Sequence, residues 1–82
     1  MSPLEKTEAL YAELVASYED GEKREIRAAA KLLMVALDRI QEFGGHGWEG
    51  MVTEYLYILK NDPERFARMM DSNRGMHKRA IN

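Results

Sequence analysis

The 82-residue chain contains no cysteine, only two prolines and only two histidines. Without cysteine there is neither a disulfide framework nor a thiolate metal site, so a chain of this length depends on packing, within itself or across a subunit interface. No apolar run approaches the roughly 20 residues that span a bilayer, and the N-terminal residues lack the basic-then-apolar pattern of a signal peptide. The sequence therefore predicts one cytoplasmic domain with no membrane segment.

Catalytic and cofactor motifs are also lacking. His46 and His77 lie in different segments, and neither belongs to an HExxH pattern or to paired acidic residues at ligand spacing, so we expect no metal site. No serine has a histidine near it in sequence, and no glycine-rich phosphate loop occurs. The carboxylates mostly lie beside lysines and arginines at helical spacing, where ion pairs are solvated. We therefore expect no enzyme, no catalytic residue and no cofactor.

Apolar residues at helical spacing are what the chain has in quantity. Apolar residues make up 45% of it and charged residues 32%, which is typical of a folded domain. Residues 28–37 (AAAKLLMVAL) are apolar nearly all the way round a helix, interrupted only by Lys31. Such a helix must be covered on several sides, either by its own neighbours or by a second copy of the chain.

Start and stop signals predict four helices. Ser2, Pro3 and Glu5 match a capping box, which predicts a helix from residue 3 to about residue 19. Gly21 is expected to end it by taking the left-handed conformation. A second helix is predicted over residues 22–43, up to a linker at residues 44–47 that holds three glycines.

Two shorter helices are predicted after the linker. The first covers residues 48–60, although the segment TEYLYIL within it also has strand propensity. Asp62 and Pro63 then suit the cap and first position of a helix over residues 63–71. The predicted fold is all-α, a compact three- to four-helix bundle with a long central helix on which the first and third helices pack. Residues 1–75 form the single domain, and residues 76–82 form a flexible basic C-terminal tail.

Charge is distributed unevenly along the chain. Residues 1–25 hold seven acidic and three basic residues, a balance of −4, whereas residues 63–82 hold five basic and two acidic residues, a balance of +3. This pattern fits two ends that attract each other or a neighbouring subunit, and it also fits a basic arm for nucleic acid.

The predicted binding surface combines aromatic, methionine and arginine side chains. Methionine adapts to irregular surfaces, and these three residue types are enriched at protein interfaces. A competing interpretation is that the fourth helix simply packs Phe66 and Met70 onto the core. The candidate partner-binding residues are Tyr57, Arg65, Phe66, Arg68, Met69 and Arg74.

Together these observations predict a small non-enzymatic protein–protein interaction module. It would act as a regulator or inhibitor that occupies a surface of a larger protein machine, for example as a phage- or plasmid-encoded inhibitor of a host nucleic-acid machine. We expect a protein partner, which the sequence does not identify, and a homodimer is compatible with the composition. The alternative is a nucleic-acid-binding accessory protein that uses the basic C-terminal region.

Overall fold

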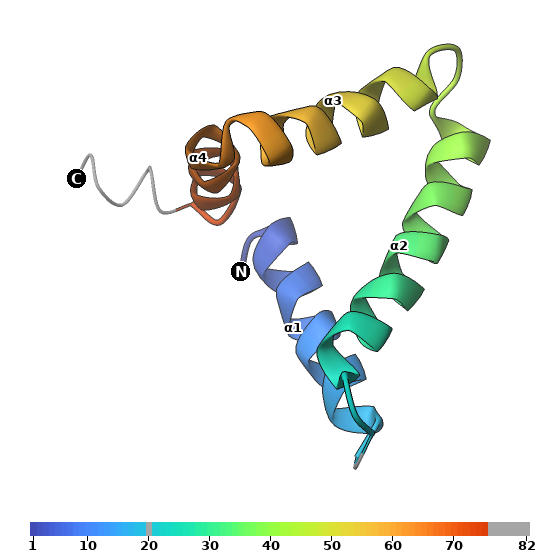
Figure 1. Ribbon diagram of the computed structural model, residues 1–82, viewed down its shortest axis with the longest axis vertical. Helices are drawn as coiled ribbons and strands as arrows, with labels where there is room; N and C mark the ends of the chain where they lie inside the picture. The colour runs from blue at the N-terminus through green and yellow to red at the C-terminus, as the bar shows by residue number, and fades with distance from the viewer. Residues whose placement is uncertain (20, 76–82) are drawn as a thin grey trace.

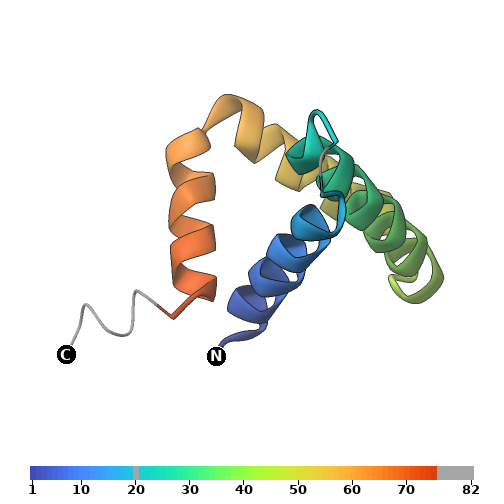
Figure 2. The ribbon, with the colours of Figure 1, turned by 90° about the horizontal axis from the view of Figure 1, so that it is seen from below.

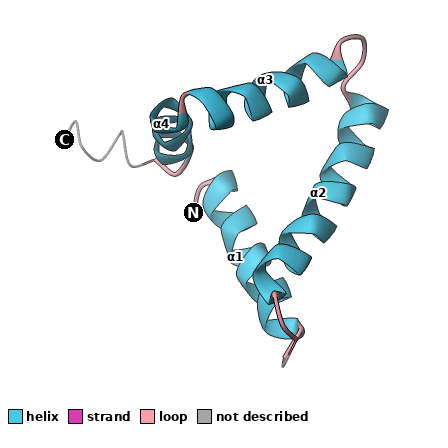
Figure 3. Ribbon diagram, in the orientation of Figure 1, coloured by secondary structure: helices cyan, strands magenta, loops and turns pink. Residues whose placement is uncertain are grey.

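The computed structural model describes residues 1–19 and 21–75. This part of the chain is all-α and holds no strand (Figure 3). The predicted all-α class is confirmed, and the TEYLYIL segment is helical. The predicted tail, residues 76–82, lies outside the described residues. The helices are α1 (Pro3–Ser17), α2 (Arg24–Phe43), α3 (Trp48–Asn61) and α4 (Pro63–Asn73).

Two helix N-termini have the predicted caps. At α1 the hydroxyl of Ser2 accepts a hydrogen bond from the Glu5 amide (3.1 Å), and the Glu5 carboxylate accepts one from the Ser2 amide (2.8 Å). At α4 the Asp62 carboxylate accepts from the Arg65 amide (3.2 Å), and Pro63 occupies the first helical position. Each cap satisfies amides that have no partner inside the helix.

The turn between α1 and α2 differs from the prediction. Gly21 is not left-handed, whereas Glu19 and Lys23 are, with φ angles of 45° and 56°. The glycine instead gives room, because a Cβ at Gly21 would collide with the guanidinium of Arg27. That guanidinium lies over the ring of Tyr18, 4.4 Å from its centre. The predicted left-handed conformation thus occurs at Glu19 and Lys23, and a side chain at position 21 would only have to displace the flexible end of Arg27.

The helices form a closed frame. Among the described residues α1 packs against α2, α2 against α3, α3 against α4, and α4 against α1, whereas the backbones of α1 and α3, and those of α2 and α4, stay more than 8 Å apart between Cα atoms. The N-terminal end of α1 lies beside the last turn of α4 in both views (Figure 1 and Figure 2). As predicted, α2 is the longest helix, and α1 and α3 pack against it, one near each of its ends (Figure 1).

Helices arranged in this way enclose only a small hydrophobic core. Within the described residues only Ala28 on α2 and Ile58 on α3 are buried hydrophobic residues, at 0% and 3% exposure. Ala28 lies in the half of α2 that α1 packs against, where a small side chain lets the two backbones approach closely. Among the described helices none combines the length and the apolarity needed to cross a membrane.

Candidate functional site

Much of the apolar run that defines α2 is left uncovered by the described part of the chain. Leu33, Met34 and Val35 are 57%, 64% and 59% exposed, and Phe43 at the end of the helix is 75% exposed. The sequence left two ways of covering this helix, its own neighbours or a second copy. In one chain the neighbours leave it largely open to water.

Part of this exposed surface lines an apolar groove between α2 and α3, which we call the α2–α3 groove. It has a volume of about 420 Å³. No charged side chain lines it, and the hydroxyl of Tyr55 is the only polar side-chain group on its walls. The lining residues are Leu33, Ala36, Leu37, Ile40, Met51, Val52, Tyr55, Leu56, Leu59 and Phe66.

Helical periodicity and the α2–α3 turn together produce the groove. The lining residues of each helix recur at spacings of three and four, so each helix presents one apolar stripe. The turn then brings the two stripes face to face. Its Gly44 amide donates to the Ile40 carbonyl (2.7 Å), and a Cβ at Gly44 would collide with that same carbonyl and lie 2.8 Å from the Cβ of Trp48.

A second hollow, of about 330 Å³, adjoins the groove, and we call it the α1–α4 hollow. Tyr55 and Phe66 line both, so the two hollows meet at these side chains. Besides those two residues it is lined by Pro3, Leu4, Thr7, Met69, Met70 and Asn73.

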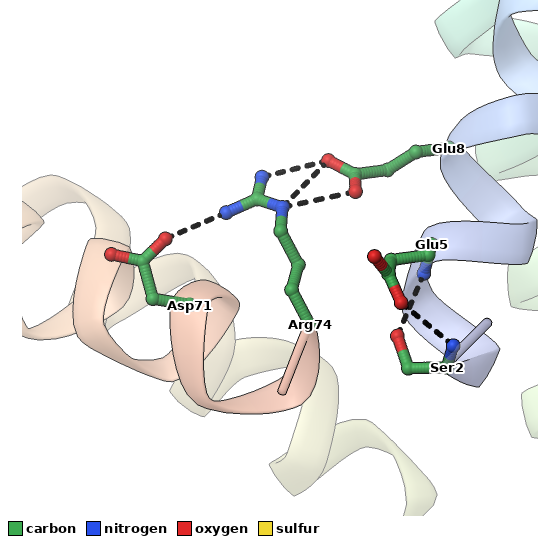
Figure 4. A network of polar contacts seen from close by, with 5 residues as sticks. All are labelled: Ser2, Glu5, Glu8, Asp71 and Arg74. Atoms are coloured by element: carbon green, nitrogen blue, oxygen red, sulfur yellow. Dashed lines mark hydrogen bonds and ion pairs between the residues drawn. The ribbon is translucent and has the colours of Figure 1, made fainter. Parts of the chain in front are cut away.

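An ion pair closes the frame next to this hollow (Figure 4). Arg74 donates through Nε to both carboxylate oxygens of Glu8 (2.9 and 3.1 Å) and through Nη2 to one of them (2.7 Å). Its Nη1 also donates to Asp71 (2.8 Å). Hydrogen bonding from Arg74 lowers the pKa of the Glu8 carboxyl, and hydrogen bonding to Glu8 raises the pKa of Arg74. The predicted attraction between the acidic and basic ends therefore occurs within one chain.

The structure brings some of the predicted contact residues together and separates others. Phe66, Met69 and Met70 are half-buried, and all three line the α1–α4 hollow. Phe66 and Met70 thus pack partly against the frame, as the competing interpretation expects. Tyr57 is 66% exposed and lines neither hollow.

The three predicted arginines are in two different situations. Arg65 and Arg68 lie one turn apart on α4, exposed to water and without an ion pair to any described residue. Arg74 is engaged with Glu8 and Asp71. Of the basic residues in the described part of the C-terminal region, two are therefore free to meet a partner.

Of the residues that line the α2–α3 groove, sequence reasoning selected Phe66 alone as a contact. Leu33 and Leu56 carry the largest exposures among the leucines of the groove, 57% and 56%. The signal was present in the apolar run of α2, but such a run is equally expected of a covered core helix. Periodicity identifies the apolar face of a helix and does not say which chain covers it.

The polar groups of the described residues form no evident metal centre. No three histidine or acidic side chains gather there as potential ligands. His46 borders a polar hollow at the α2–α3 turn together with Glu42 and Glu49. In comparisons with known proteins, no family model, curated protein or solved structure matches the chain.

Proposed function

We propose that this chain is a non-enzymatic protein–protein interaction module of the cytoplasm, a regulator or inhibitor that acts by occupying a surface of a larger protein. The observation that carries the proposal is the mainly apolar lining of two adjoining hollows, the α2–α3 groove and the α1–α4 hollow. Soluble proteins seldom leave large apolar surfaces open to water, and those that do use them to bind other chains. Burial of this surface by a partner supplies the driving force for binding.

The residues around this apolar surface suit the same role. Tyr57 offers an exposed aromatic ring, and Arg65 and Arg68 offer guanidinium groups that no described carboxylate neutralises. Tyrosine and arginine are the residue types most enriched among energetically dominant interface contacts, together with tryptophan. The apolar inner surface would provide affinity, and these polar groups at the outside would provide selectivity.

Site-specific photo-crosslinking in the source cells tests the proposal. A photoreactive amino acid replaces Leu56 in the groove in one variant and Tyr57 on the outer face in another. The matched control replaces Lys31 on the polar side of α2. We expect polypeptide adducts at position 56 and none at position 31. The absence of any polypeptide adduct at positions 56 and 57 would contradict the proposal.

The regulatory part of the proposal needs a second step. Mass spectrometry identifies any larger protein crosslinked at either position, and the activity of that purified protein is then measured with and without this chain. We expect the wild-type chain to change that activity and a Tyr57→Ala, Arg65→Ala, Arg68→Ala variant to lose at least part of the effect. An unchanged activity with the wild-type chain would exclude regulation of that partner.

Nucleic-acid binding is the second candidate, and the free pair Arg65 and Arg68 favours it. Phosphate contacts require only such exposed cations. If the candidate holds, the chain binds generic DNA or RNA at low salt, and binding weakens with a log–log salt slope of about −2 for two phosphate contacts. Fluorescence anisotropy with the Arg65→Ala, Arg68→Ala variant measures this. If the variant binds nucleic acid as strongly as the wild type, Arg65 and Arg68 do not make the phosphate contacts.

A further inference from the structure

The chain exposes far more surface than a folded monomer of its size. Its accessible surface is 6915 Å², whereas a compact protein of 9.5 kDa exposes about 5,000 Å². Counting the eight undescribed residues at the full accessible surface of an unfolded chain leaves a surplus of about 800 Å² for the described residues. A standard protein interface buries about 800 Å² on each partner, so the surplus is large enough for a stable complex.

The thin core indicates that the partner must be permanent. Fixing each residue of a chain costs about 1–2 kcal/mol of backbone conformational entropy, and burial of apolar surface is the main compensation. Here the described residues include two buried hydrophobic side chains, Ala28 and Ile58, and no disulfide is available. Small domains in this situation are stabilised by oligomerisation. The only chain certain to be present whenever this one is synthesised is another copy of itself.

The chemistry of the α2–α3 groove fits a self-complementary contact. In a two-fold dimer the same patch meets itself, so any charge near the axis faces an identical charge. The groove walls carry no charged residue, and no such repulsion arises there. Permanent dimer interfaces are also more apolar than transient ones and resemble a domain core cut in half.

We propose that a second copy of this chain fills the α2–α3 groove, so that the α2 and α3 helices of two copies form one shared apolar core. This inference goes beyond the proposed function, because it assigns the α2–α3 groove to a second copy and leaves the α1–α4 hollow for the larger protein. In the dimer Leu33 and Leu56 of each copy are buried against the other copy. Tyr57, Arg65 and Arg68 lie outside the groove walls and stay available to other partners.

Adjacent residues on α2 provide a matched pair of variants. Leu33 lines the groove, whereas Met34 does not, and the two are 57% and 64% exposed within one chain. Leu33→Glu would place a carboxylate in the shared core twice, once from each copy. We expect it to raise the dimer dissociation constant at least about 30-fold, the equivalent of one strong interface contact. Met34→Glu should change the constant less than about 3-fold, as for a surface substitution.

Light scattering on the purified full chain gives the mass directly. The expected mass of the wild type is twice the 9.5 kDa of one chain at micromolar concentration. A monomer at every concentration, or a dimer that both variants weaken equally, would overturn the inference. A purified chain that is unfolded by circular dichroism would also overturn the inference. Other copies of the chain are present in that sample, so they would have been shown not to stabilise the fold.

Isotope-filtered NMR keeps the inference testable if Leu33→Glu unfolds. A mixture of labelled and unlabelled wild-type chains should give intermolecular contacts from the methyl groups of Leu33 and Leu56 and none from Met34. A dimer without the two leucine contacts would place the interface elsewhere and refute the inference. Failure of the inference remains distinct from failure of the proposed function: a monomer that crosslinks another protein at position 56 keeps the function and excludes the second copy.

Discussion

Arg74, the residue that caps α4, binds both carboxylate oxygens of Glu8 on α1 from 66 positions further along the sequence. This contact joins the two ends of the frame (Figure 4). Thr7 and Asn73, the neighbours of the two residues in sequence, line the α1–α4 hollow. A two-pronged guanidinium–carboxylate contact fixes orientation as well as distance. The pair therefore contributes to the spacing of α1 and α4, together with the apolar side chains that line the hollow between them.

Removing the carboxylate should loosen that end of the frame. Glu8→Gln deletes the charge and leaves the side chain nearly the same size, so we expect a lower melting temperature and faster amide hydrogen exchange in the first turns of α1 and the last turn of α4. Glu13→Gln is the matched control, since it removes the same charge from α1 at a residue that has no ion pair in the described structure. Equal effects of the two substitutions would show that overall charge, and not the pair, is responsible.

The same pair predicts a pH dependence of stability. Because hydrogen bonds from Arg74 lower the pKa of Glu8 in the folded chain, folding favours the ionised carboxyl. This stabilisation is complete above the ordinary Glu pKa of 4.5 and is lost as the pH falls through the lowered folded value. Because hydrogen bonding to Glu8 raises the pKa of Arg74, its guanidinium loses its charge only at strongly alkaline pH, and the ion pair is lost there as well.

Melting curves of the wild type and of Glu8→Gln between neutral and acidic pH measure this dependence. We expect the wild type to melt at the higher temperature near neutrality and the difference to close in acid, once Glu8 is protonated. A carbon-13 titration of the Glu8 carboxyl should give a pKa below its ordinary value. A constant difference across the pH range would contradict the assignment of the effect to this carboxylate.

The local features of the fold could be predicted from the sequence because they depend on neighbouring residues. The capping box of Ser2 and Glu5 and the cap by Asp62 each require a partner three positions away, and both form as predicted. The Gly21 turn could not be predicted in the same way. Its left-handed residues are Glu19 and Lys23, which are not residue types that mark such positions in a sequence, and the guanidinium of Arg27 reaches back from α2 to lie over Tyr18.

The candidate site was harder to predict for a different reason. Leu33 and Leu56 have the periodicity of core residues, and nothing in a sequence distinguishes a face covered within the chain from one covered by another chain. The structure separates the two cases by their exposure to water. Likewise Arg74 looked like Arg65 and Arg68 in sequence, and only the fold shows that Glu8 engages it.

Enlarging the buried Ala28 should push α1 and α2 apart. Ala28 has no exposed surface, so Ala28→Leu must displace its neighbours, which costs about 1–3 kcal/mol of folding free energy. Ala30→Leu adds the same side chain at an exposed position of the same helix and should change stability by about 0.5 kcal/mol or less. Urea denaturation at one protein concentration compares the two. A similar loss in both would mean that leucine is poorly tolerated on α2 wherever it is placed, and would contradict close packing at Ala28.

Two glycines near the α2–α3 turn should respond oppositely to alanine. A Cβ at Gly44 would collide with the Ile40 carbonyl, so Gly44→Ala must shift the backbone and change the angle at which α2 meets α3. Gly50 lies inside α3 with open space where its Cβ would be, and Gly50→Ala should stabilise the helix by about 0.5–1 kcal/mol. Urea denaturation measures both changes in stability. Binding of an apolar fluorescent dye measures the groove, and we expect altered dye binding for Gly44→Ala alone. If Gly44→Ala left both stability and dye binding unchanged, the turn would not control the geometry of the groove.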